Sequence, residues 1–413
     1  MSFLSINTNK NILNFVTKRT WLDIFFLTIS FFFFMFPFSL SIGDEGLSAN
    51  YSFLLLPLFY LFTNKIKVPT TKFILIISFY ILIFFIAAVY QYEFYVFFPR
   101  RIISFIIFIT MFSYLFIKID YDLISCFKNA IILIALYFSI STLFKFIFLG
   151  GNDLGFAGKG EVGSQRFGFI YVMSLWILIF NDPKKKLHLL YKYIMILLII
   201  IGLLLTFSRS GIVAMGATIF FFYVKSLHQW FKTPTFKGIL KFIFILTLVI
   251  IAIILLYIFF PLLFEFFNTR LFSFFLGTGD ETLDVANEES SEGFRIFLIK
   301  KVLSFVLSNP ITGGGYLGVW VLFEDLSGSA HNQYLDILFR TGIFGLFIYI
   351  YLLYLIISTL KNIDKSLFWG VLGVIIYGFF HETFKLSQGA FVFSFLLGVV
   401  GSRNKILINN EDK

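Results

Sequence analysis

The stretch SAHNQYLDILFRTGIFGL, Ser329 to Leu346, joins a long polar loop to an apolar run near the end of this 413-residue chain. It opens on a histidine and an asparagine, His331 and Asn332, and its apolar residues predict a helix that enters the membrane without a break. Because an imidazole titrates near neutral pH, a histidine at the junction of water and lipid is well placed for proton transfer. His331 is therefore the first candidate for chemistry.

The composition places the rest of the chain in a membrane. Hydrophobic residues make up 59% of it and charged residues only 14%, whereas soluble domains carry about 25% charged residues. Successive apolar runs approach the roughly 20 residues that cross a bilayer core. Because backbone polar groups in lipid must be satisfied internally, these runs are predicted to be helices. We expect an all-α polytopic membrane protein in which residues 1–413 form a single integral membrane domain.

About twelve of these runs are predicted to be transmembrane spans. They lie near residues 21–42, 51–63, 73–90, 102–118, 129–149, 167–180, 190–206, 211–224, 239–263, 335–359, 367–380 and 388–402. Residues 264–334 are predicted to form one large loop between the ninth and tenth spans. Within it, an amphipathic helix near 292–308 is expected to lie along the membrane surface, starting after Ser291 and ending at Asn309–Pro310.

The charge distribution orients the chain. A formal charge of +10 is compatible with nucleic-acid binding, but most of the lysines fall in short loops on one predicted side, which is the positive-inside pattern. We therefore expect both termini in the cytoplasm, the large loop on the outer face of the cytoplasmic (inner) membrane, and no nucleic-acid partner. The single cysteine, Cys126, excludes an internal disulfide, a CxxC redox pair and a cysteine-based zinc site.

Arginines are concentrated on the predicted outer side, against the topological rule. They are Arg100, Arg101, Arg166, Arg209, Arg270, Arg295 and Arg340. The guanidinium group makes planar bidentate contacts to phosphate and carboxylate, so this set predicts a phosphorylated ligand on the outer face, with Arg100, Arg101 and Arg166 among the residues that bind it. The alternative, arginine side chains snorkelling at helix ends, explains any single one of them equally well.

Arg209 lies in a short predicted turn, LLTFSRSGIVA from Leu204 to Ala214. Ser208 and Ser210 flank it, so backbone N–H groups and the start of the next helix are predicted to face an anion that the guanidinium also binds. Arg295 falls in the first turn of the predicted loop helix, where an anion would also meet a helix N-terminus. The alternatives are an interfacial arginine in a helical hairpin and a surface arginine paired with nearby glutamates.

Several polar residues near His331 have two interpretations. His331 is a candidate general base or a helix-capping histidine, and Asn332 either orients an acceptor or caps the helix. Asp336 and Arg340 are spaced i,i+4, so a mutual ion pair is the simplest explanation for both. His381 and Glu382, at the outer end of the eleventh span, are weaker candidates for polar contacts.

Other chemistries lack their motifs. HExxH and Walker-type GxxxxGK[ST] sequences are absent, and the acidic run from Asp280 to Glu292 is too irregular in spacing to predict a metal site. No metal and no cofactor is expected.

Three segments together resemble a known family. LTFSRSGIVA, GFRIFLIKKVLSFVLSNPITGGGYLG and SAHNQYLDILFRTGIFGL, in this order, are similar to the O-antigen polymerase and O-antigen ligase superfamily of bacterial surface-polysaccharide glycosyltransferases. The resemblance covers Leu204 to about Leu346. It implies a metal-independent, inverting GT-C-type transferase that uses an undecaprenyl-diphosphate-linked glycan as donor, with Arg209, Arg295 and His331 as catalytic residues.

The resemblance leaves the acceptor open. A repeat-unit polymerase of O-antigen or capsule is the leading interpretation, an O-antigen ligase that transfers the glycan to lipid A-core is the alternative, and a lipid-linked glycan transporter or flippase is a rival from another class. Expected partners are the lipid-linked oligosaccharide, a glycan or lipid A-core acceptor, membrane lipid and a chain-length regulator. The predicted site faces the periplasm or exterior.

Overall fold

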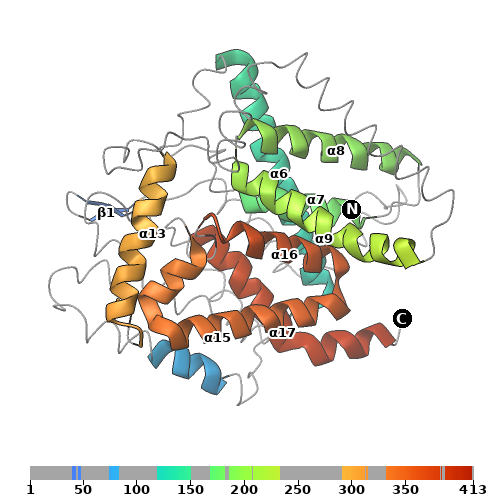
Figure 1. The fold of residues 1–413 in the computed structure, drawn as a ribbon. Helices are drawn as coiled ribbons and strands as arrows, with labels where there is room; N and C mark the ends of the chain where they lie inside the picture. The colour runs from blue at the N-terminus through green and yellow to red at the C-terminus, as the bar shows by residue number, and fades with distance from the viewer. Residues whose placement is uncertain are drawn as a thin grey trace. The chain divides into compact units, whose positions relative to one another are not determined.

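Most helices of the computed structural model coincide with apolar runs of the sequence. The structure describes residues 40–42, 45–47, 74–82, 119–149, 168–181, 186–206, 208–232, 291–311, 313–314, 332–381, 383 and 387–411. Its main helices are α6 (Tyr121–Leu149), α7 (Gly168–Ile179), α8 (Lys186–Leu205), α9 (Arg209–Lys232), α13 (Ser291–Ser308), α15 (Gln333–Ile363), α16 (Lys365–Tyr377) and α17 (Ser387–Glu411) (Figure 1). A further short helix covers residues 74–82.

Membrane character is confirmed for the described part of the chain, which contains three helices long and apolar enough to cross a bilayer: Tyr121–Phe148, Leu187–Leu205 and Gln333–Ile363. Shorter apolar helices lie within α7, α9, α16 and α17. The total of about twelve spans and the sides of the membrane stay predictions.

Helix α6 begins at Tyr121, well before the span predicted from residue 129. The Asp120 carboxylate accepts a hydrogen bond from the backbone N–H of Leu123 at 2.9 Å, which caps the helix start. The helix therefore begins about two turns before its continuous apolar part. Hydropathy alone does not mark this start, because the first turns contain polar residues.

The helices agree with the predicted all-α class, and the described residues contain one short strand pair beside them. Strands β1 (Leu40–Ile42) and β2 (Glu45–Leu47) form a small antiparallel hairpin with Ile42 opposite Glu45. The predicted first span therefore does not remain helical to residue 42.

The chain folds into two compact units. One unit comprises Met1–Ala214 and Leu298–Lys413, and the other comprises Met215–Phe297. The described residues of the second unit are the later part of α9 and the first turns of α13. The first unit contains all the other helices and the packing that follows.

Helix α7 is the centre of the first unit. Every residue from Gly168 to Leu178 is buried, and α7 contacts α6, α8 and α16. The ring of Trp176 stacks on that of Trp369 of α16 at 5.4 Å between centroids. A helix that is apolar on all sides is expected to be enclosed by its neighbours, and α7 fits that expectation.

Other helices expose apolar side chains on one face. Phe144, Ile147 and Phe148 of α6 are 58%, 62% and 67% exposed, and Phe347 and Tyr354 of α15 are each 63% exposed. Water would oppose such continuous apolar faces, whereas hydrocarbon is their natural surrounding in a spanning helix. We assign these faces to lipid contact.

Helix α15 is broken, contrary to the prediction of an uninterrupted helix after Asn332. Gly342 has φ 63° and ψ −169° inside it, so α15 changes direction there (Figure 1). The lengths require this. The 31 residues of α15 would extend about 46 Å if straight, and the 13 of α16 about 20 Å, yet the two helices meet at both ends.

Candidate active site

The starts of α7, α9 and α15 meet at the C-terminal end of α16. The backbone N–H of Gln333, at the start of α15, donates to the carbonyl of Gly378 at 2.8 Å. At the start of α7, a Cβ added to Gly168 would lie 2.6 Å from Oγ of Ser208 and 2.7 Å from Cε2 of Tyr377. These ends were all predicted to lie on the outer side. We call Ser208, Ser210, Asn332, Tyr377 and His381 the candidate cluster.

Ser208 and Ser210 organise the start of α9. Oγ of Ser208 accepts the backbone N–H of Gly211 at 3.3 Å, as an N-cap residue does, and lies 3.3 Å from Oγ of Ser210. Both side chains are buried. Their hydroxyl groups therefore shape the turn that presents Arg209, the first residue of α9. Opposite this turn, glycine at 168 leaves the room that Ser208 and Tyr377 occupy.

Asn332 caps α15 and joins it to α16. Its Oδ1 accepts the backbone N–H groups of Tyr334 and Leu335, each at 3.0 Å, while its Nδ2 donates to the carbonyl of Phe379 at 2.9 Å. The Tyr334 hydroxyl donates to the carbonyl of Ile375 at 2.8 Å. The capping interpretation of Asn332 is confirmed. Its second amide interaction, toward α16, is one that spacing in the sequence cannot predict.

His381 lies at the same helix ends. Its ring stacks on Tyr377 with centroids 5.2 Å apart and 21° between planes, and its backbone N–H donates to the carbonyl of Tyr377. Tyr377 itself is fully buried. The sequence predicted His381 only as a weaker candidate for polar contacts, and it did not predict a role for Tyr377 or Tyr334. The available signal was the aromatic and polar run YGFFHE at the end of an apolar run.

The roles of the three predicted catalytic residues stay predictions, because none of their side chains belongs to the described part of the chain. His331, Arg100, Arg101 and Arg166 lie outside the described residues. Arg209 and Arg295 are placed only by their backbones, in the first turns of α9 and α13, and their side chains lie outside the described part. What the structure establishes is the setting of two of these positions: Arg209 follows Ser208 directly, and His331 directly precedes Asn332.

The predicted ion pair in α15 is present. Nε of Arg340 lies 2.7 Å from Oδ2 of Asp336, and the two side chains are 8% and 0% exposed. A buried guanidinium that already faces a carboxylate is less suited to bind a phosphorylated ligand. Arg340 is therefore set apart from the other arginines of the predicted outer side.

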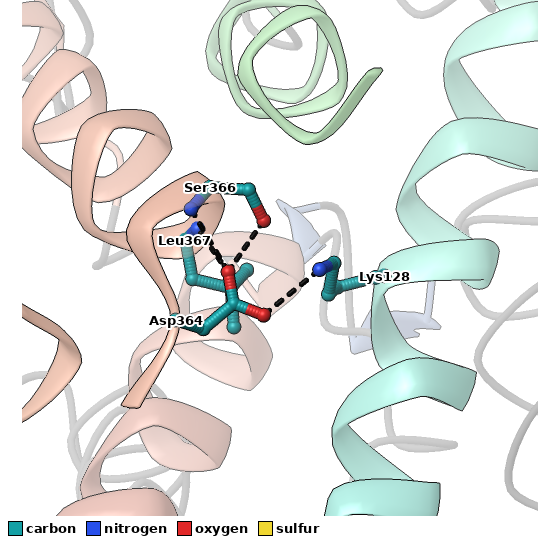
Figure 2. Close-up of polar contacts among 4 residues, drawn as sticks. All are labelled: Lys128, Asp364, Ser366 and Leu367. Carbon is teal, nitrogen blue, oxygen red and sulfur yellow. Dashed lines mark hydrogen bonds and ion pairs between the residues drawn. The ribbon is translucent and has the colours of Figure 1, made fainter. Parts of the chain in front are cut away.

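At the opposite helix ends, an ion pair ties α6 to the junction of α15 and α16 (Figure 2). Nζ of Lys128 lies 2.8 Å from Oδ2 of Asp364, while Oδ1 accepts the backbone N–H groups of Ser366 and Leu367. Burial by itself raises the pKa of the Asp364 carboxyl, but Lys128 and the hydrogen bonds from Ser366 and Leu367 outweigh it and hold that pKa below its usual range. Both partners were predicted to lie on the cytoplasmic side.

A metal site would need several ligating side chains side by side. Among the residues that the structure describes, no three His, Cys, Asp or Glu side chains are grouped in that way.

The comparisons with known proteins agree with the sequence motifs. A family model described as O-Antigen ligase matches residues 194–350. The matched segment contains Arg209, Arg295, His331 and the break in α15, and it confirms the resemblance to the O-antigen ligase and polymerase superfamily. No curated protein matches the chain. Together with the apolar helices, the match supports a membrane protein that is similar to O-antigen ligases over residues 194–350.

Proposed function

We propose, from the match of residues 194–350 to the O-antigen ligase family, that this chain transfers a glycan from a lipid-diphosphate carrier to a sugar hydroxyl at the outer face of the cytoplasmic membrane. The carrier is an undecaprenyl diphosphate and the enzyme is a metal-independent, inverting glycosyltransferase. The observation that carries the proposal is the matched segment itself, because it holds Arg209, Arg295 and His331 in the order that the resemblance requires.

The chemistry needs an acid–base group and positive charge. The acceptor hydroxyl attacks the anomeric carbon of the donor, a new C–O bond forms, and the bond from that carbon to the diphosphate oxygen breaks with inversion. His331 accepts the hydroxyl proton. The diphosphate leaves as an anion, and Arg209 and Arg295 stabilise the charge that develops on it, as electrostatic catalysis requires.

Arg209 is supported by its surroundings. It is the first residue of α9, whose start is capped by Ser208 and fixed against Tyr377 across Gly168. A helix N-terminus favours an anion through its exposed N–H groups and dipole, so a guanidinium there adds to an existing preference. We propose that Ser208 and Ser210 shape this anion site, and that Arg100, Arg101 and Arg166 extend it.

The acceptor we favour is a second carrier-linked glycan, which makes the protein a repeat-unit polymerase for O-antigen or capsule. A polymerase joins two carrier-linked substrates and so meets two diphosphates, and the predicted outer side carries arginines beyond the two assigned to the leaving group. The second candidate is a ligase that uses lipid A-core as acceptor. The description of the matched family, O-Antigen ligase, favours it.

A transporter of lipid-linked glycan is the rival from another class. The break in α15 and the buried Asp336–Arg340 pair are features that transporters also use. In transporters, however, the groups freed by a helix break coordinate cargo. Here the carbonyl of Phe339 accepts the N–H of Gly314, and the N–H of Ile343 donates to the carbonyl of Pro310. These groups are therefore used within the fold, which favours a structural break over a transport site.

One assay separates these functions. Purified protein in nanodiscs is given a synthetic undecaprenyl-diphosphate oligosaccharide, alone or with lipid A-core, and the products are sized on a gel. A ladder of products from the donor alone identifies a polymerase, and transfer only to lipid A-core identifies a ligase. No turnover with either acceptor, together with donor flipping in sealed vesicles, would reject glycosyl transfer in favour of transport.

A further inference from the structure

The strongest feature outside the candidate cluster is the crossing of two chain segments at the break in α15. Residues 309–311 and 313–314, which follow α13, lie against Gly342; we call them the clasp segment. Both Gly313 and Gly342 have positive φ, 64° and 63°, a region that is costly for residues with a Cβ. All of these residues belong to the first unit.

The crossing exchanges hydrogen bonds between the two segments. In a continuous helix, the N–H of Ile343 would donate to the carbonyl of Phe339, four residues earlier. Here Ile343 donates to the carbonyl of Pro310 at 2.8 Å, and the carbonyl of Phe339 accepts the N–H of Gly314 instead. The Ile343 N–H and the Phe339 carbonyl, which lose each other at the break, are therefore both satisfied by the other segment, as burial in a membrane protein demands.

The contact is too close for any side chain at the two glycines. A Cβ on Gly313 would lie 2.6 Å from the Gly342 nitrogen and 2.6 Å from the Phe339 carbonyl oxygen, and a Cβ on Gly342 would collide with the Ile311 carbonyl. The ring of Phe339 is fully buried and packs on Phe305 of α13 at 4.6 Å. These contacts fix the end of α13 to the middle of α15.

The part of α15 before the break is short and is held at both ends. Gln333 to Thr341 is bounded by the clasp segment on one side and by the Asn332 bridge to α16 on the other. The Asp336–Arg340 pair and the Thr341 hydroxyl, which donates to the Ile337 carbonyl at 2.7 Å, stiffen it internally. A shift at the clasp segment would therefore be transmitted to Asn332, the residue that follows His331 in the sequence.

We propose that Gly313 and Gly342 are positioning residues, which fix the first part of α15 and its capping residue Asn332 to the chain that follows α13. The proposal rests on the proposed function for its kinetic consequence, since it assumes that His331 takes part in glycan transfer. Its structural content does not depend on that function.

The kinetic test compares Gly342→Ala and Gly313→Ala with Gly216→Ala, a helical glycine whose added Cβ would meet nothing within 4 Å. We expect kcat for glycan transfer, per folded molecule, to fall at least tenfold in the first two variants while KM for the donor stays within twofold. Gly216→Ala should match the wild type. Wild-type kcat in folded Gly342→Ala would overturn the proposal.

A milder variant covers the case in which the alanine variants do not fold. Phe339→Leu adds no atom at the two glycines and removes the buried ring that packs on Phe305 of α13, so it loosens the crossing without a clash. We expect about a tenfold loss of kcat. Unchanged kcat in this variant would also contradict the proposal.

A structural readout separates this proposal from the proposed function. Spin labels at Ser308→Cys and Phe347→Cys, both exposed, in a Cys126→Ser background, report the distance between α13 and α15 whether or not transfer is detected. We expect a narrow distribution in the wild-type sequence that broadens or shifts with Gly342→Ala. An unchanged distribution overturns the proposal, and absent wild-type transfer with a broadened one rejects only the proposed function.

Discussion

At the scale of single residues, the polar groups of the candidate cluster serve the fold and the proposed chemistry together. Ser208 caps α9 next to Arg209, and Asn332 caps α15 next to His331. Ser208 thus fixes the first turn of α9, which Arg209 begins, and Asn332 fixes the first turn of α15, directly after His331 in the sequence. This arrangement explains why buried serines and an asparagine stand at helix ends in such an apolar chain.

The proposed catalytic residues give the most direct prediction. Arg209→Lys and Arg295→Lys keep the charge but lose the planar bidentate fork, and His331→Ala removes the base. We expect each change to lower kcat for glycan transfer about 100-fold or more, comparable to the loss of one oxyanion donor. The measurement is product formation from the synthetic donor at equal amounts of folded protein. Arg403→Lys, on the opposite predicted side, is the matched control. Full activity in all three variants would reject the mechanism.

Asn332 gives a second prediction, because two substitutions separate its roles. Asn332→Ala loses both the cap and the bond to Phe379, and we expect it to cost about 2 kcal/mol of stability from one cap and one hydrogen bond. Asn332→Asp keeps an oxygen for the cap and loses only the donor, so it should cost about half as much. The free energy of unfolding, measured by denaturant titration in mixed micelles, tests this order. Asn362→Ala, at an exposed bond in the last turn of α15, is the control. Wild-type stability of Asn332→Asp would contradict the bridge to α16, and equal losses for Ala and Asp would contradict the cap.

At the scale of elements, the sequence predicts most of the helices but not how they end or bend. Apolar runs predicted α7, α8, α15, α16 and the loop helix α13 to within a few residues, because lipid and buried faces both select apolar side chains. The break at Gly342 was missed, since a single glycine in an apolar run is usually tolerated within a helix. The clasp segment, remote in sequence, supplies the hydrogen-bond partners at the break. The grouping of His381 and Tyr377 with Ser208 was missed for the same reason, because it depends on tertiary contacts.

The junction of α6 with α15 and α16 yields a prediction about pH. The pKa of Asp364 is lowered in the folded protein, so the ion pair with Lys128 contributes stability above the unfolded pKa of Asp, about 4, and loses it as pH falls through the lower folded pKa. Asp364→Asn keeps the helix cap and removes the charge. We expect it to lower the free energy of unfolding by about 1 kcal/mol at pH 7, as for a partly exposed ion pair. Between pH 5 and pH 2, the free energy of unfolding of this variant should fall less than that of the wild type.

The measurement is the unfolding midpoint of the wild type and of Asp364→Asn across this pH range. The two curves should converge at the acidic end, because protonation makes the wild-type carboxyl neutral as well. Asp122→Asn, in the first turn of the same helix α6 and exposed, controls for a general change in charge. Parallel curves that never converge would mean that the Lys128–Asp364 pair does not account for the difference.

At the scale of the whole molecule, the contacts sort helix ends into two sets. One set joins the starts of α7, α9 and α15 to the end of α16. The other joins the start of α6 to the α15–α16 junction and to α17, through Lys128–Asp364 and the bond from Ile119 to Ser402. These sets coincide with the two sides that loop charge predicts. On the predicted topology, the candidate cluster lies on the outer side, where a substrate delivered along the outer face of the membrane would reach it.

This topology gives the last prediction, and the cysteine content makes it simple to test. Cys126 is buried, so a Cys126→Ser background allows single cysteines to be placed at will. Lys361 lies near the α15–α16 junction and Ser308 at the end of α13, and both are exposed. We expect Ser308→Cys to react with a membrane-impermeant maleimide in intact spheroplasts. Lys361→Cys should react only after the membrane is permeabilised, because lysines of that loop follow the positive-inside rule. The reverse pattern would place the candidate cluster in the cytoplasm, where a carrier-linked glycan destined for the cell surface has not yet been exported, and would exclude transfer at the outer face.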